Sequence, residues 1–142
     1  MVMLALFVVP MARAQAVSVA LPVGVVADDG IGLRPGVRIG FEPVPAASLD
    51  LQVASSFQGY WDTGLSLTGR LWFGGYNDGG VYGLGRMTAG FAGDELGVGP
   101  WTGLAVGFGG RPVPALDIAA AAGPEWTLNG GPRWRTELTI GV

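Results

Sequence analysis

Apolar and polar residues alternate one by one in eight short stretches of this chain. In the first stretch, small or polar residues separate Val17, Val19 and Leu21. The eight stretches cover residues 17–25, 37–42, 49–57, 65–73, 86–91, 103–108, 116–121 and 133–142. A period of two, interrupted by clusters of Gly, Pro, Asp and Asn, is typical of β-strands joined by turns. The pattern predicts an all-β chain.

The composition of the two faces indicates which one points inward. Around residues 101–109 the polar face holds only Gly and Ala after Trp101, and the apolar face carries no charged residue in any stretch. Small side chains suit the narrow interior of an eight-stranded barrel. A continuous apolar face is tolerated only in lipid or in a sealed core. The apolar face is therefore expected to point outward.

Segment lengths agree with a barrel. Residues 17–142 provide roughly 16 residues for each of eight strands with its connection, and a tilted membrane strand uses about 9–11 of these. The connections at 43–46, 77–80 and 111–114 are compact. Of the four that alternate with them, those at 28–35, 93–100 and 123–132 are longer, and the one at 60–63 is not. Short turns at one end and longer loops at the other are typical of outer-membrane barrels. The sequence predicts an eight-stranded antiparallel up-and-down transmembrane β-barrel.

Aromatic residues on the apolar face lie near the ends of the stretches. Since antiparallel neighbours run in opposite directions, such positions fall alternately at the two rims of a barrel, where aromatic residues meet the membrane interfaces. The predicted girdle consists of Phe41, Phe57, Phe73, Phe91, Phe108 and Trp134.

Charged residues of the polar face would point into the lumen. They are Arg38, Glu42, Asp50, Arg70, Arg86, Asp117, Arg133, Arg135 and Glu137. Near balance of charge is what a sealed interior requires, because unpaired buried charge is costly. Arg70 and Arg86 are expected to lie close together across the connection at 77–80, with Asp50 as their counter-ion. The sequence thus predicts a lumen filled by a charge network.

The N-terminal segment is expected to be a signal peptide. Residues 1–9 are almost wholly apolar but too few for a membrane helix, which needs about 20. Ala12, Ala14 and Ala16 are spaced as in a small-x-small cleavage site. No positive charge precedes the apolar run, so the segment would be a signal peptide shortened at its start. The predicted organisation is a signal peptide at 1–16 and a barrel domain at 17–142.

The 142-residue chain contains no Lys, His or Cys. Their absence removes Ser–His–Asp and Cys–His nucleophiles, the usual zinc ligands and disulfides. A net charge of −3 without a basic patch provides no surface for nucleic acid. We therefore expect no enzyme activity, no catalytic or metal-binding residues and no cofactor.

The pattern over residues 17–142 resembles the small Gram-negative outer-membrane β-barrels, which include OmpX-like proteins and the transmembrane domain of OmpA-like proteins. The last stretch carries the most specific part of the resemblance, because Trp134, Leu138 and Ile140 alternate up to Val142. The chain departs from the family in ending with Val142 where an aromatic residue is usual, and in having Thr136 on the apolar face. The resemblance implies an outer-membrane location, a surrounding lipid bilayer and recognition of the last strand by the assembly machinery.

The residues leave three functions open. The first is a structural or surface-interaction barrel with a plugged lumen, whose outer connections would expose Trp61, Trp126, Asp94 and Glu95. The second is a secreted lipocalin-like barrel with its apolar face around an apolar ligand. The third is a narrow pore.

Overall fold

A computed structural model describes residues 16–27, 30–44, 46–57, 60–73, 80–94, 97–113, 115–127 and 130–142. The predicted signal peptide at 1–16 lies outside these residues, except for Ala16. The strands are β1 (Ala16–Ala20), β2 (Val23–Ala27), β3 (Ile31–Val44), β4 (Ala47–Phe57), β5 (Trp61–Phe73), β6 (Val81–Asp94), β7 (Gly97–Val113), β8 (Leu116–Thr127) and β9 (Gly130–Gly141). No helix long and apolar enough to cross a membrane occurs in the described part of the chain.

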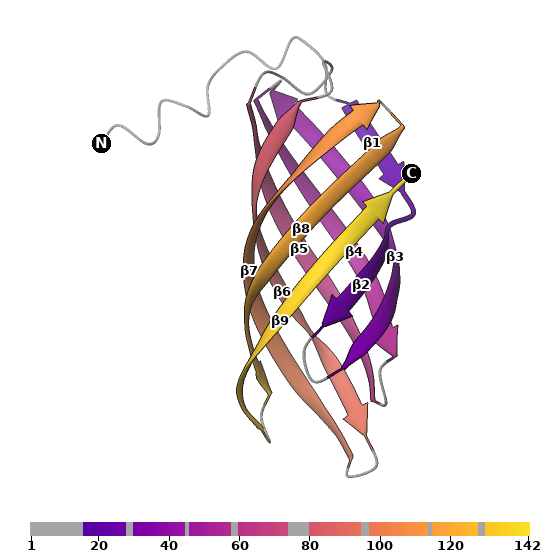
Figure 1. The fold of residues 1–142 in the computed structure, drawn as a ribbon, viewed down its shortest axis with the longest axis vertical. Coiled ribbons are helices and arrows are strands. Elements are labelled where there is room, and N and C mark those ends of the chain that lie inside the picture. The colour runs from indigo at the N-terminus through magenta and orange to yellow at the C-terminus, as the bar shows by residue number, and fades with distance from the viewer. Residues whose placement is uncertain are drawn as a thin grey trace, which may run out of the picture.

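The strands close into one barrel (Figure 1). From β3 onward each strand pairs antiparallel with the next, and β2 pairs with β9 to complete the ring. β1 and β2 act as one strand, because both pair with β3 in the same register, Ala20 opposite Arg38 and Val23 opposite Pro35. Pro22 separates them, since it has no backbone N–H to donate. The ring therefore has eight strands, which confirms the predicted fold.

The barrel has two rims, a terminal rim and a distal rim. The terminal rim carries the start of β1, the end of β9 and the connections at 45–46, 74–80 and 114–115; the distal rim carries those at 28–30, 58–60, 95–96 and 128–129. The prediction of longer connections at the distal rim is wrong, since the longest one, at 74–80, lies at the terminal rim. The strands extend through Pro35 and Pro124, which the sequence analysis had placed in loops.

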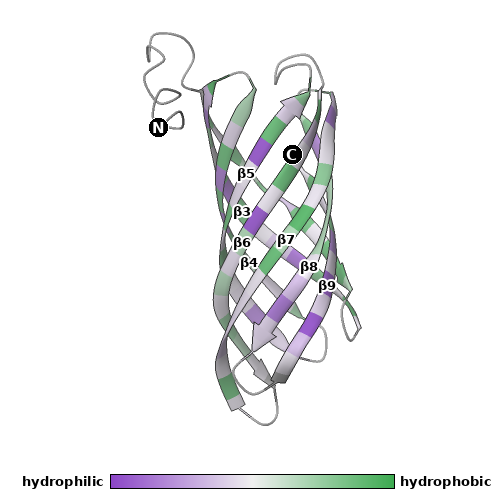
Figure 2. Cartoon of the chain, turned by 90° about the vertical axis from the view of Figure 1, so that its left-hand side faces the viewer, coloured by the Kyte–Doolittle hydropathy of each residue, from purple (hydrophilic) through white to green (hydrophobic). Residues whose placement is uncertain are grey.

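Side chains point alternately into and out of the barrel. In β5 odd-numbered residues such as Leu65 and Leu67 are exposed, whereas Ser66, Thr68 and Arg70 are almost fully buried. Figure 2 shows the resulting alternation of hydrophilic and hydrophobic residues along the strands. The apolar face points outward, as expected. The lipocalin-like alternative, which needs that face inside, is wrong because the interior is polar.

The residues of the predicted aromatic girdle all lie on the outer surface. Phe41, Phe73 and Phe108 lie toward the terminal rim, whereas Phe57, Phe91 and Trp134 lie toward the distal rim. Two further indoles, Trp61 and Trp126, are also outward-facing at the distal ends of β5 and β8. Trp61 and Trp126 thus belong to strands, and not to loops as expected. Together with Trp134 they place all three outward-facing indoles at the distal rim.

Candidate functional site

Inside the barrel lies every charged side chain that the structure describes. Seven arginines and six carboxylates occupy the lumen, and all of them except Arg111 and Arg133 are almost fully buried. The strand positions divide most of them into two groups, one toward each rim. Burial of so many charges is favourable only where each has a partner of opposite sign.

The terminal cluster consists of Arg38, Asp50, Arg70, Trp72, Tyr82 and Asp117. Asp117 is its centre: its Oδ2 atom lies 2.8 Å from Arg38 Nη2 and 3.3 Å from Arg70 Nη1, and its Oδ1 atom accepts a hydrogen bond from the Tyr82 hydroxyl. Arg70 Nε also lies 3.1 Å from Asp50 Oδ2, and its guanidinium group lies over the Tyr82 ring. One carboxylate thus links three strands.

Two aromatic rings complete a layer across the lumen within the terminal cluster. The Trp72 indole donates a hydrogen bond to Ser48 Oγ on β4, and its ring lies 4.5 Å from that of Tyr82. Tyr82 extends from β6 over Gly109 of β7, where a side chain would collide with the ring, and reaches Asp117 on β8. Asp117 in turn binds Arg38 on β3. Contacts therefore cross the lumen from β4 to β8 and on to β3.

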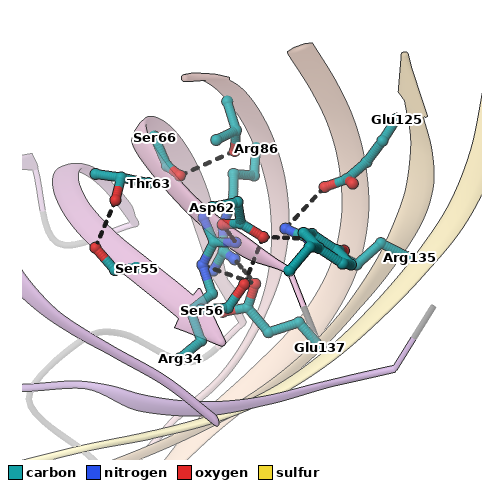
Figure 3. Close-up of polar contacts among 12 residues, drawn as sticks. Arg34, Ser55, Ser56, Asp62, Thr63, Ser66, Arg86, Glu125, Arg135 and Glu137 are labelled. Carbon is teal, nitrogen blue, oxygen red and sulfur yellow. Dashed lines mark hydrogen bonds and ion pairs between the residues drawn. The ribbon is translucent and has the colours of Figure 1, made fainter. Parts of the chain in front are cut away.

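The distal cluster consists of Arg34, Asp62, Arg86, Trp101, Glu125, Arg133, Arg135 and Glu137, most of which Figure 3 shows. Asp62 lies 3.1 Å from Arg34 Nη1 and 2.6 Å from Arg135 Nη2, and it also accepts a hydrogen bond from Ser56. Glu137 lies 3.0 Å from Arg86 Nη1. Glu125 lies 3.0 Å from Arg135 Nη1. These ion pairs join β3, β5, β6, β8 and β9.

Trp101 is the aromatic centre of the distal cluster. The guanidinium carbons of Arg34 and Arg135 lie 5.6 and 5.1 Å from the centre of its ring. Such cation–π contacts favour the charged form of arginine in a site with little water.

The structure places all nine charged residues expected in the lumen there, and all of them except Glu42 belong to one of the two clusters. Asp50 is beside Arg70, the partner that the sequence analysis assigns to it. Arg86 does not share this counter-ion, since its guanidinium group pairs with Glu137. Arg70 pairs across the strands with Leu84, and Arg86 with Thr68, so the two arginines lie at different heights along the barrel.

Sequence reasoning gave no part in the charge network to six residues that complete the two clusters, although it placed Trp101 on the polar face. They are Arg34, Asp62, Trp72, Tyr82, Trp101 and Glu125. The signal that could have found them is an even spacing in the sequence from residues already placed on the inward face of the same strand. Arg34 is four residues before Arg38, and Glu125 eight residues after Asp117, so each pair shares one face of its strand. Pro35 and Pro124 were interpreted as turn residues, and the alternation was stopped too early.

The Tyr82 hydroxyl provides a test of the terminal cluster. Tyr82→Phe keeps the ring over Gly109 but leaves Asp117 without one donor, so we expect a loss of about 1–3 kcal/mol in the free energy of unfolding. Tyr60→Phe is the matched control, because the Tyr60 hydroxyl bonds Arg135 in a half-buried position at the distal rim. Urea titration in micelles would measure both. An equal effect of the two substitutions would contradict the role given to Tyr82.

An eight-stranded closed barrel with charges inside and apolar side chains outside has the architecture of the small transmembrane β-barrels. Comparison of the sequence with protein-family profiles and with curated proteins finds no match. Two solved structures are similar in fold. The N-terminal β-barrel domain of Pseudomonas aeruginosa OprF has a TM-score of 0.63 at 14% identity, covering 91% of this chain and 98% of that chain. Neisserial surface protein A (NspA) has a TM-score of 0.63 at 12% identity, covering 91% and 97%.

Both similar structures are eight-stranded barrels of Gram-negative outer membranes. At these identities the likeness is one of fold. It agrees with the resemblance found in the sequence and with the outer-membrane location that the resemblance implies.

Proposed function

We propose that this protein is an integral outer-membrane β-barrel with a structural or surface-interaction role and no enzymatic activity. The observation that carries the proposal is the distribution of polarity. Every described charged side chain is in the lumen, whereas large apolar side chains on every strand face outward. An apolar surface of this extent is stable in a bilayer and would promote aggregation in water.

The contents of the lumen support a plugged barrel. Eight strands enclose a space that side chains can fill. In the terminal cluster, Tyr82 has no exposed surface, and Asp50, Arg70 and Trp72 have 3–5%. This burial supports a plug that hydrated ions do not pass.

The short distal connections support a structural role over that of an elaborate receptor. The partners that this role implies are the lipid bilayer and, through the last strand, the outer-membrane assembly machinery. Three outward-facing indoles, Trp61, Trp126 and Trp134, lie at the distal rim. Indoles at the ends of strands suit the interface between lipid and water, where the ring is buried and the N–H meets headgroups.

Refolding from urea with and without detergent micelles tests the membrane assignment. We expect strand signal in circular dichroism only with micelles, together with a mobility shift between boiled and unboiled samples on a denaturing gel. The apolar outer surface would have no favourable solvent without detergent. A monomeric folded protein in buffer alone would contradict the proposal.

Planar-bilayer recording tests the plug. We expect no stepwise current from the inserted wild-type barrel, because the terminal cluster crosses the lumen. Insertion is verified separately by protease protection of the reconstituted protein, and a known porin provides the positive control. Regular single-channel steps in the wild type would support the narrow pore instead.

A further inference from the structure

The distal half of the lumen contains a cavity with a volume of about 30 Å³. Part of its wall is formed by small residues of β7 and β8, namely Gly103, Ala105, Ala121 and Gly123. One water molecule needs about 10–15 Å³ of such space, so the cavity is larger than a single water molecule requires. The cavity therefore has room for one small ion.

Trp101 lines this cavity, and its indole N–H has no hydrogen-bond partner among the described residues. The residue is 3% exposed, and its indole Nε1–H makes no hydrogen bond within the described part of the chain. Indole can only donate. A buried donor without an acceptor is costly, so the site favours a ligand that accepts hydrogen bonds.

The other polar groups around the cavity are mainly donors. Arg34, Arg86 and Arg135 all line it, and a guanidinium group carries donors but no acceptor. Each lining carboxylate has an arginine partner: Glu137 lies 3.0 Å from Arg86 Nη1, and Glu125 Oε1 lies 3.0 Å from Arg135 Nη1. Glu125 Oε2 lies 3.7 Å from Arg133 Nε and makes no hydrogen bond within the described part of the chain. Their negative charge is thus neutralised by arginine.

The charges of the distal cluster add up to an excess of one positive charge. The cluster contains four arginines, Arg34, Arg86, Arg133 and Arg135, and three carboxylates, Asp62, Glu125 and Glu137. The terminal cluster, in contrast, has two arginines and two aspartates. The excess in the distal cluster comes from Arg133, which is half-buried, because the three almost fully buried arginines equal the three carboxylates in number. An anion in the lumen would offset it.

We propose that this cavity is a binding site for one small monovalent anion, such as chloride, which accepts a hydrogen bond from the Trp101 indole and faces the surrounding guanidinium groups. The inference goes beyond the proposed membrane role and rests on the lumen alone. The bound anion stabilises the folded barrel and occupies a space that the strands leave unfilled.

Unfolding in micelles tests this site with sodium chloride and sodium gluconate at equal ionic strength, since gluconate is too large for the cavity. A ligand that binds only the folded state stabilises it in a saturable way. We expect the melting temperature to rise with chloride to a plateau, and to stay constant with gluconate. Equal behaviour in the two salts would overturn the proposal and leave water as the occupant.

Trp101→Phe is the matched variant, because it removes the N–H and keeps the ring between the two arginines. We expect it to lose the chloride-dependent shift, whereas Trp72→Phe, which removes an indole of the terminal cluster, keeps it. A Trp101→Phe barrel that retains the full shift would contradict the site.

Chloride-35 NMR of the wild-type barrel tests the site without any substitution. We expect excess line broadening from the folded protein in micelles, reversed by bromide and lost on unfolding; no excess broadening would overturn the proposal. A failure here leaves the membrane assignment intact, because that assignment depends on folding only in detergent.

Discussion

Asp117→Ala is expected to lower the free energy of unfolding by about 3–5 kcal/mol, the range for breaking a buried ion pair from one side. The substitution removes the carboxylate that binds Arg38 at 2.8 Å and Arg70 at 3.3 Å. It also removes the acceptor of the Tyr82 hydroxyl. Two guanidinium groups with 3–5% exposure would then share only Asp50 among the members of the terminal cluster. Urea titration in micelles, followed by circular dichroism, measures the loss.

Asp50→Asn is the matched control within the same cluster. Arg70 retains Asp117 when Asp50 loses its charge, so the expected loss is smaller than for Asp117→Ala. It should still be measurable, because Arg70 Nε lies 3.1 Å from Asp50. An Asp50 variant as unstable as the Asp117 variant would show that the layer is not centred on Asp117. An unchanged free energy of unfolding would show that the pairing of Asp50 with Arg70 does not stabilise the barrel.

The period of two was sufficient to predict the strands and the orientation of their faces. Each strand of a closed barrel has one face in the lumen and one outside, so the alternation reports directly on the fold. The small residues of the inward face, such as Gly103 and Ala105, indicated a narrow interior, and the structure places both in the lumen.

The connections and the partners inside the lumen could not be derived in the same way. Proline and glycine usually end strands, but Pro35 lies within β3 opposite Val23, next to the break between β1 and β2. The pairing of arginines depends on the direction that each long side chain takes along the barrel axis. Arg70 and Arg86 lie on neighbouring strands, yet the first reaches Asp117 and the second Glu137.

Gly107→Ala is expected to destabilise the barrel by about 3 kcal/mol, at the upper end for overpacking, because the collision is with backbone. A Cβ atom at Gly107 of β7 would overlap the carbonyl oxygen of Ala120 on β8, and it would lie 2.7 Å from the Cα atom of Ala121. The backbone of β8 cannot move away from an added methyl group as the end of a flexible side chain can. Glycine at this position permits the close approach of the two strands.

Gly85→Ala is the control for this substitution. Gly85 lies on the outer face of β6, and nothing lies within 4 Å of the position that its Cβ would take. Alanine should therefore be neutral or stabilise by up to about 1 kcal/mol, since glycine loses more conformational freedom on folding. The fraction of protein that keeps its unboiled mobility on a denaturing gel at rising temperature compares the two variants. If the Gly107→Ala and Gly85→Ala variants lost their unboiled mobility at the same temperature, the close approach of β7 and β8 would not limit the packing of the barrel.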